Sequence, residues 1–417
     1  MKHKSVSCAQ IDDEGRLILP KEVLLRHGLK PGAKLPIGGN EHSIILRRPI
    51  NHLAKVYIEP TNQCNLICRT CIRNIWDEPQ GMMDEKTFER AVEGLRIFSP
   101  PPMILFGGFG EPLFHSGIVE MVSKAKGLGS SVELITNGTL LTEELSRQLT
   151  EVGLDVLWVS LDGATPESYA DIRLGALLPE VLENVTRYRD IHLACRNRLP
   201  QMGIVFVAMK RNIADLPAVM RLGRKLGTDR ILVTNVLPYV EEMGDEVLYN
   251  LALNDLAKAP SPWLPHLNLS KMDMNEDTCE PLYKIIRVWR INNFAQEGMH
   301  TSNNYCPFIE SGSTAICWDG GMSPCLPLLH THTSFLNEHM RVSRRYVVGN
   351  VNERSVGELW NTPEYVALRE RVQTFDFSPC TFCGGCDLSK ANEEDCSGSV
   401  FPTCGGCLWA QGVIHCP

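Results

Sequence analysis

Between residues 55 and 236 the sequence alternates strand-like and helix-like segments, and this alternation constrains the fold more than any other feature. The apolar, strand-length runs are residues 55–59, 103–107, 131–136, 155–161, 202–208 and 230–236. Helical patterns follow Asp84 and occupy about 117–127, 142–152, 179–190 and 214–226. Parallel strands need crossover connections, so the sequence predicts the α/β class with a parallel sheet. Six such units cannot close an eight-stranded barrel, and an open, partial (βα)6 TIM-type barrel is expected.

Three cysteines follow the first predicted strand closely. Cys64, Cys68 and Cys71 form a CxxxCxxC triplet. Three thiolates at this spacing can hold three irons of a [4Fe–4S] cube and leave the fourth iron open for a substrate or cofactor. The alternative is a zinc knuckle with a distant fourth ligand. Zinc sites usually combine a CxxC pair with a second pair, and no second pair follows nearby, so the open cluster is favoured.

Two further motifs stand at the ends of predicted strands. The glycine-rich segment 106–112 (FGGFGEP) follows the second strand, and 159–163 (VSLDG) ends the fourth. Ordinary βα turns and helix caps are the alternative explanations for both motifs. A phosphate loop is not expected, because no GxxxxGK[ST] pattern occurs. The carboxyl ends of parallel strands share one edge, so these motifs and the cysteine triplet should converge.

With these motifs in this order, residues 55–240 resemble the radical SAM superfamily. The resemblance implies that Cys64, Cys68 and Cys71 hold a [4Fe–4S] cluster whose open iron binds S-adenosylmethionine (SAM). One-electron reduction would then cleave SAM to a 5′-deoxyadenosyl radical that abstracts hydrogen from a substrate. One position departs from the family, because Thr70 stands where an aromatic residue usually packs near the adenine. Other residues must then cover that side of the cofactor.

The resemblance also implies a set of SAM contacts. Glycines would let the backbone approach the methionine part closely, and Ser160 and Asp162 could bond the ribose hydroxyls. The expected contacts are Gly107, Gly108, Gly110, Glu111, Asn137, Ser160 and Asp162. Asn137 could equally be a turn residue. Adenine contacts are expected near Val207 and residues 236–238, and no catalytic acid or base stands out.

The chain has 16 cysteines, and most of them lie after residue 300. In a reducing compartment such crowding indicates metal binding. Cys306, the following Gly320 and Cys325, and the Cys380–Cys383 pair resemble the SPASM domain, which implies two auxiliary [4Fe–4S] clusters. The expected ligands are Cys306, Cys325, Cys380, Cys383, Cys396, Cys404, Cys407 and Cys416. Cys317 and Cys386 are left out, the distribution over the two clusters stays open, and a zinc-ribbon pair is the alternative.

The first 51 residues read as a small β-rich module. A turn and strand at 11–20, a short helix over 21–27 and a closing strand at 43–46 resemble the swapped-hairpin domain of the AbrB and SpoVT families. So small a module favours dimerisation or docking. Four domains are predicted: the N-terminal module at 1–51, the barrel at 52–245, a linker at 246–300 and an iron–sulfur domain at 301–417. The linker contains a proline-rich break at 258–266 and a predicted helix near 280–296.

The formal net charge is −8 and no basic stripe occurs, so nucleic-acid binding is not expected. No apolar run is long enough for a membrane span and no signal-peptide core is present, which predicts a cytoplasmic protein without a membrane partner.

A narrower resemblance is carried by three segments: the N-terminal head module (residues 1–51), the GGFGEP motif, and the terminal cysteine segment (residues 404–417). Together they resemble the maturases of tungsten-cofactor aldehyde oxidoreductases. That resemblance implies that the protein modifies the oxidoreductase or its tungstopterin cofactor. The expected partners are a protein or peptide substrate and a ferredoxin or flavodoxin electron donor, and the small N-terminal module favours a homodimer. The alternatives are a SPASM peptide or sulfatase maturase, and a redox-sensing iron–sulfur regulator that binds DNA.

Overall fold

The computed structural model describes residues 8–26, 29, 32, 35, 37–40, 43–46, 48–196, 200–228, 230–254, 267–288, 304–336, 339–381 and 386–417. Its centre is one sheet in the order β11-β10-β9-β8-β7-β6-β5-β12-β13-β16. The six predicted strands are present and pair in parallel with their sequence neighbours. They are β5 (Lys55–Ile58), β6 (Met103–Phe106), β7 (Val132–Thr136), β8 (Val156–Ser160), β9 (Gln201–Ala208) and β10 (Arg230–Asn235).

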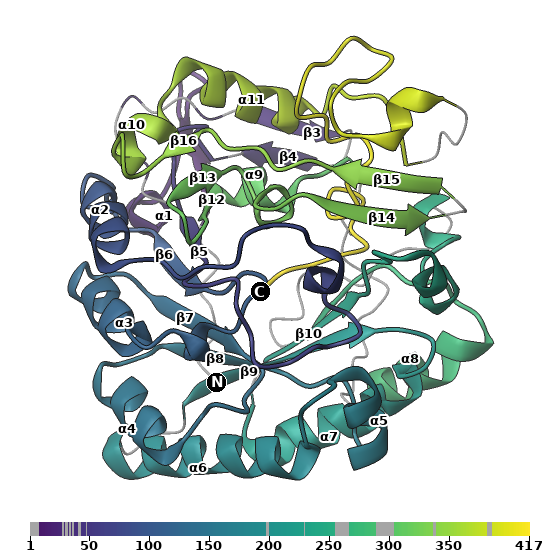
Figure 1. The fold of residues 1–417 in the computed structure, drawn as a ribbon. Coiled ribbons are helices and arrows are strands. Elements are labelled where there is room, and N and C mark those ends of the chain that lie inside the picture. Colours follow the sequence, from purple (N-terminus) through teal and green to yellow (C-terminus); the bar gives the residue numbers. More distant parts are fainter. Residues whose placement is uncertain are drawn as a thin grey trace.

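Helices follow these strands and lie along the outside of the curved sheet (Figure 1). They are α2 (Glu85–Leu95), α3 (Ile118–Gly127), α4 (Glu143–Glu151), α5 (Pro166–Ile172), α6 (Leu178–Arg196) and α7 (Leu216–Leu226). Asp84 caps α2 as predicted, accepting a hydrogen bond from the backbone N–H of Thr87 at 2.6 Å. Helix α5 was not predicted. It is short, and its start depends on a Thr165–Ser168 capping box rather than on an apolar face.

The sheet extends beyond the six predicted strands at both ends. β11 (Leu267–Leu269) pairs in parallel with β10, and β12 (Ser313–Ile316) pairs in parallel with β5. β13 (Gly321–Ser323) and β16 (Gly349–Asn350) continue the sheet antiparallel. The predicted cysteine-rich region therefore shares a sheet with the barrel. β11, β13 and β16 have only two or three residues, and β12 (STAI) is no apolar run, so pairing in the folded chain defines these strands.

The C-terminal half contains further helices and strands. They are α8 (Glu276–Val288), α9 (Pro307–Ser311), β14 (His332–Leu336), β15 (His339–Ser343), α10 (Val356–Trp360) and α11 (Pro363–Thr374). Helix α8 packs against α7, and α9 packs against β12. Helix α8 matches the predicted helix near 280–296 up to residue 288. The proline-rich break, residues 289–296 and Cys383 lie outside the described residues. The proposed domain boundaries stay predictions.

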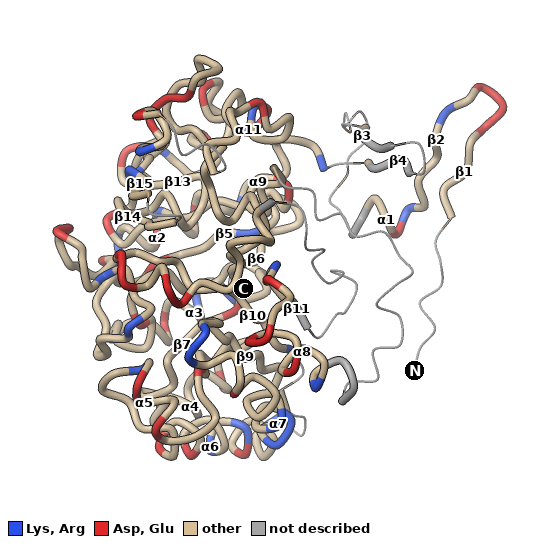
Figure 2. The backbone as a smooth tube through the Cα atoms, turned by 90° about the vertical axis from the view of Figure 1, so that its right-hand side faces the viewer, with Lys and Arg blue, Asp and Glu red and all other residues tan. Residues whose placement is uncertain are grey.

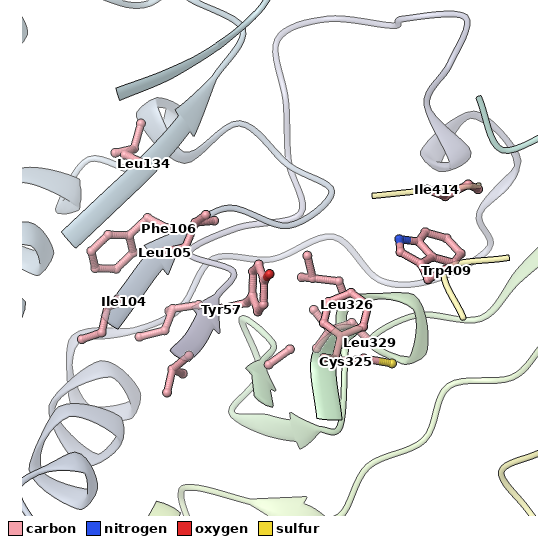
Figure 3. Close-up of a cluster of buried hydrophobic side chains, with 14 of the residues drawn as sticks. Tyr57, Ile104, Leu105, Phe106, Leu134, Cys325, Leu326, Leu329, Trp409 and Ile414 are labelled. Atoms are coloured by element: carbon pink, nitrogen blue, oxygen red, sulfur yellow. The ribbon is translucent and has the colours of Figure 1, made fainter. Parts of the chain in front are cut away.

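Buried side chains from the barrel and from the C-terminal half form one continuous core. Figure 3 shows Tyr57 of β5 between Phe106 of β6 and Leu326 and Leu329 of the C-terminal half. The Tyr57 ring also meets Phe308 of α9 edge to face, with ring centroids 5.7 Å apart. The side chains that meet here from the barrel and from the C-terminal half are largely apolar, so removing them from water stabilises the contact between the two halves.

The N-terminal residues form two small antiparallel hairpins and one helix. These are β1 (Gln10–Ile11) with β2 (Leu17–Ile18), α1 (Lys21–Arg26), and β3 (Ile37–Asn40) with β4 (Ser43–Leu46). They lie to one side of the barrel (Figure 2). The elements agree with the predicted strand, helix and closing strand, while the AbrB-like resemblance stays a prediction. Among the residues with described structure, no helix combines the length and apolar character that a bilayer span requires.

Candidate active site

A cavity of about 250 Å³ opens beside the carboxyl ends of the barrel strands. The predicted residues that line it are Cys64, Cys68, Cys71, Gly108, Gly110, Glu111, Asn137 and Ser160. The structure thus brings together residues from four separate loops, as the convergence of parallel strand ends predicts. Gly107 and Asp162 are not part of the lining.

Hydrogen-bond donors surround the sulfur atoms of the cysteine triplet. The backbone N–H of Leu66 lies 3.4 Å from Cys64 Sγ, and Asn137 Nδ2 lies 3.7 Å from the same atom. Arg173 Nη1 lies 3.8 Å from Cys68 Sγ. Burial raises the pKa of the Cys64 and Cys68 thiols, so without metal they keep their protons. The donors suit thiolates, the form in which cysteine binds iron.

The glycine-rich loop after β6 is shaped by its packing against the cysteine loop. Gly108 has φ +141°, and a Cβ there would lie 2.6 Å from Glu59 Oε1. A Cβ on Gly110 would overlap the backbone carbonyl of Thr61. These glycines therefore allow two backbone segments to meet at the cavity wall, which the sequence motif alone did not reveal.

Replacing Gly110 by alanine should weaken SAM binding at least about tenfold, because the added methyl group must displace the cysteine loop from the cavity wall. Equilibrium binding of SAM to the anaerobic, cluster-loaded protein measures the effect. Gly127→Ala is the matched control, since nothing lies within 4 Å of a Cβ at that helical position. Equal SAM affinities of the two variants would contradict the tight fit of the loop.

Glu111 ties the end of β6 to the end of β7. Its Oε1 accepts hydrogen bonds from Thr136 Oγ1 at 2.7 Å and from the backbone N–H of Leu113 at 3.0 Å. Its Oε2 accepts one from the backbone N–H of Asn137 at 2.7 Å. Burial raises the pKa of Glu111 in spite of these bonds. The side chain therefore fixes the cavity wall as well as lining it.

Asp162 lies behind the cavity wall and holds an arginine in place. Its Oδ2 accepts a hydrogen bond from Arg173 Nε at 2.6 Å, and its Oδ1 accepts one from the backbone N–H of Val207 at 2.7 Å. Burial by itself lowers the pKa of Arg173, but the charge of Asp162 and the hydrogen bond to it raise that pKa above its usual value. This placement does not favour the expected ribose contact of Asp162, and Arg173 reaches the cavity instead. No motif marks Arg173 in the sequence.

The far wall combines one polar atom with apolar side chains. Asn235 donates from Nδ2 to the backbone carbonyls of Lys271 at 2.8 Å and Val413 at 2.7 Å. Its buried Oδ1 lacks a hydrogen-bond partner among the described residues, and Asn235 lines the cavity. A buried acceptor of this kind fits a donor on a ligand, such as an amino group. Sequence reasoning did not identify Asn235.

The apolar part of this wall agrees with the expectation for an adenine. Val207 and Leu237, near which adenine contacts were expected, line the cavity together with Trp409 and Ile414. The last two come from the terminal cysteine segment, hundreds of residues after Thr70. They place an aromatic and an aliphatic side chain on the cavity that Thr70 also lines.

One group of C-terminal cysteines is centred on the buried residues Cys306 and Cys325. Burial raises the pKa of the Cys325 thiol well above its usual value, and the neighbouring Cys306, Cys407 and Cys404 act in the same direction. Cys416 lies near Cys407 and accepts a hydrogen bond from the Trp409 indole at 3.3 Å. Four mutually close thiols are what one [4Fe–4S] cluster needs.

A second group of cysteines lies nearer the surface. Burial raises the pKa of Cys380, and Cys396 and Cys386 add to this effect as close neighbours. Cys386, which the sequence interpretation left out, therefore lies with the expected ligands. Cys317, also left out, lies with neither group but beside Glu59.

Comparisons with known proteins agree with this geometry. A family model described as the radical SAM superfamily matches residues 58–222, and the model of the SPASM iron–sulfur cluster-binding domain matches residues 306–387. The solved structure of Streptococcus suis SuiB bound to S-adenosylmethionine has the same fold, with a TM-score of 0.53 at 18% identity over 84% of this chain and 74% of that chain. The protein is thus a radical SAM enzyme of the SPASM type. Its cofactors are a SAM-binding [4Fe–4S] cluster, whose reduction cleaves SAM to a 5′-deoxyadenosyl radical, and auxiliary iron–sulfur clusters.

Relatives place the chain within this class. It is 30% identical to the tungsten-containing aldehyde ferredoxin oxidoreductase cofactor-modifying protein of Pyrococcus furiosus over 87% of this chain and 96% of the relative. It is 25% identical to the Fe-coproporphyrin III synthase of Methanosarcina barkeri over 84% of both chains. The chain belongs to the family of radical SAM proteins with a SPASM domain that includes the Pyrococcus protein.

Proposed function

We propose that this enzyme modifies a tungsten-containing aldehyde oxidoreductase or its tungsten cofactor. The supporting observation is the similarity to the Pyrococcus cofactor-modifying protein over 96% of that relative's length, which includes the barrel and the SPASM region. The three thiols, the donors around them and the orphaned acceptor of Asn235 support a SAM site in the cavity.

Each wall of the cavity suits a different part of SAM. The thiols of Cys64, Cys68 and Cys71 hold the cluster, and Arg173 is positioned to bind the carboxylate of SAM. Ser160 offers a hydroxyl to the ribose. Asn235 Oδ1 accepts from the adenine amino group, while the apolar far wall covers the ring.

The two auxiliary clusters divide the C-terminal cysteines between them. Cys306, Cys325, Cys404 and Cys407 hold the buried cluster, with Cys416 beside it. Cys380, Cys383, Cys386 and Cys396 hold the other. Because Cys386 and Cys396 are exposed, this second cluster is the entry point for electrons from a ferredoxin or flavodoxin.

This division predicts separate losses of iron. Cys306→Ala and Cys386→Ala should each remove about four irons per chain, and the double variant about eight, because each replacement breaks a different cluster. Iron and acid-labile sulfide determination on anaerobically reconstituted protein measures the losses. If Cys386→Ala keeps all its iron, the assignment of the second cluster is wrong.

The head module supplies a contact between two copies of the chain. Ile37 and Ile44, on the two strands of one hairpin, are 72% and 82% exposed. Covering them in a homodimer would bury apolar surface that water now contacts. Ile44→Lys should turn a dimeric full-length chain into a monomer in sedimentation analysis, with Ile97→Lys (65% exposed, outside the head) as control.

The proposed function is tested with the oxidoreductase as substrate. The tungsten oxidoreductase, made in a host without this enzyme, is incubated anaerobically with the enzyme, SAM and dithionite. A mass change of the oxidoreductase or its extracted cofactor, stoichiometric with 5′-deoxyadenosine, supports the proposal. Formation of deoxyadenosine without any change in either would contradict the proposal and favour the alternative, a peptide or sulfatase substrate.

The remaining alternative, a redox-sensing regulator that binds DNA, conflicts with membership of an enzyme family. The regulator hypothesis is supported only by the resemblance of the N-terminal module to AbrB and SpoVT domains, which stays a prediction.

A further inference from the structure

Three buried side chains meet between the barrel and the SPASM region, outside the cavity. Glu59 directly follows β5, Cys317 directly follows β12, and the two strands are parallel neighbours, so both residues stand at the same edge. His330 comes from the segment before β14. All three are at most 1% exposed.

The three ligand atoms face one point. Cys317 Sγ lies 3.5 Å from Glu59 Oε2 and 3.8 Å from His330 Nε2, and the latter two atoms are 2.8 Å apart. Zinc–sulfur bonds of about 2.3 Å and zinc–nitrogen bonds of about 2.0 Å at a tetrahedral angle place ligand atoms about 3.3–3.6 Å apart. Two of the three separations already fit, and the third must open by roughly half an ångström, within side-chain freedom.

The histidine is oriented as in a metal site. Glu78 Oε2 lies 2.5 Å from His330 Nδ1, which turns Nε2 toward Glu59 and Cys317. A carboxylate on the far nitrogen of a ligating histidine is the usual outer contact of zinc-bound imidazole. Trp76 stacks on the same ring with centroids 4.3 Å apart, and Phe109 meets it edge-on at 5.7 Å. The ring is thus fixed on every side.

We propose that Glu59, Cys317 and His330 bind a zinc ion that links the barrel to the SPASM region. A thiolate, an imidazole and a carboxylate form a ligand set that suits zinc, and a water completes the four-coordinate shell.

Charge is conserved when the ion enters. In the metal-free cluster, burial lowers the pKa of His330, but its bonds to Cys317, Glu59 and Glu78 raise it to about 12. Burial raises the pKa of Cys317 to about 11. The ring is therefore an imidazolium and the sulfur a thiol. Zinc displaces one proton from His330 Nε2 and one from Cys317. The two positive charges of the ion therefore replace the two positive charges of the released protons.

The ion would act on the SAM site through one bond. Glu59 Oε1, the oxygen not facing Cys317, accepts a hydrogen bond from the backbone N–H of Phe109 at 2.9 Å. Phe109 belongs to the glycine-rich loop and lines the cavity. A metal on Oε2 holds the carboxylate, and through it the loop, in one orientation.

Elemental analysis of the full-length protein tests the proposal. Protein with fully loaded iron–sulfur clusters is dialysed anaerobically against buffered free zinc, and zinc and iron are measured together. We expect about one zinc per wild-type chain, with a zinc X-ray absorption spectrum showing one sulfur and three nitrogen or oxygen neighbours. Cys317→Ala should lose this zinc and keep its iron. Cys195→Ser, an exposed helical cysteine, is the control and should keep both.

A gentler variant guards against misfolding of Cys317→Ala. Glu78→Gln leaves all three ligands in place and removes only the orienting carboxylate, so the zinc dissociation constant should rise about 10–100-fold. The proposal is overturned if the wild-type chain takes up no zinc, if its spectrum shows several sulfurs, or if Glu78→Gln binds zinc as tightly as wild type.

Discussion

Replacing Cys64, Cys68 and Cys71 together by alanine should abolish the formation of 5′-deoxyadenosine and lower the iron content from about 12 to about 8 atoms per chain. The reason is that no other thiols line the cavity within the described residues, so the SAM-binding cluster has no substitute ligands. Chromatography of reactions with dithionite and SAM, alongside iron determination, measures both effects.

The control for this variant is Cys195→Ser, whose exposed thiol lies on α6 and does not line the cavity. It should retain both deoxyadenosine formation and iron. Residual deoxyadenosine in the triple variant with about eight irons would show that an auxiliary cluster cleaves SAM, and the assignment of the site would be wrong.

Replacing Asp162 by asparagine should lower the free energy of unfolding by about 3–5 kcal/mol, because it leaves the Arg173 guanidinium buried without a counter-charge. The pair is almost fully buried, with side chains 0% and 11% exposed. Urea unfolding of the anaerobic protein, followed by circular dichroism, measures the loss. SAM affinity should fall as well, since Arg173 is no longer held at the cavity.

Asp171→Asn is the matched control. Asp171 also pairs with arginines, Arg69 and Arg211, but its side chain is 44% exposed. Its removal should cost less than about 1 kcal/mol. In the double variant Asp162→Asn, Arg173→Leu, part of the lost stability should return, because an apolar side chain tolerates burial without a partner. Equal losses for Asp162→Asn and Asp171→Asn would refute the buried-charge argument.

The barrel could be predicted from the sequence because apolar runs alternate with helical patterns, and this repeat specifies parallel pairing between strands that follow each other in the chain. The same holds for Cys64, Cys68 and Cys71, where spacing within one loop specifies the ligand geometry. The short strand β12 could not be predicted, since its four residues become a strand through pairing with β5.

Other parts of the site escaped prediction for a similar reason. Arg173 and Asn235 stand in no motif, and their roles arise from Asp162 and from an unpaired oxygen at the cavity wall. For Asp162 the position at a strand end suggested contact with a ligand, but in the structure its carboxylate accepts hydrogen bonds from Arg173 and from the backbone of Val207. Trp409 reaches the cavity through the path of the terminal segment, which local patterns cannot reveal.

That path has a consequence for the order of events during synthesis. The ribosome adds roughly 5–20 residues per second, so the cysteine triplet emerges many seconds before Trp409 and Ile414. A cluster inserted during this interval would have its open iron exposed to solvent and oxygen. The cavity wall is complete only after residues 409–414 dock, so a cluster inserted after that step meets a finished pocket.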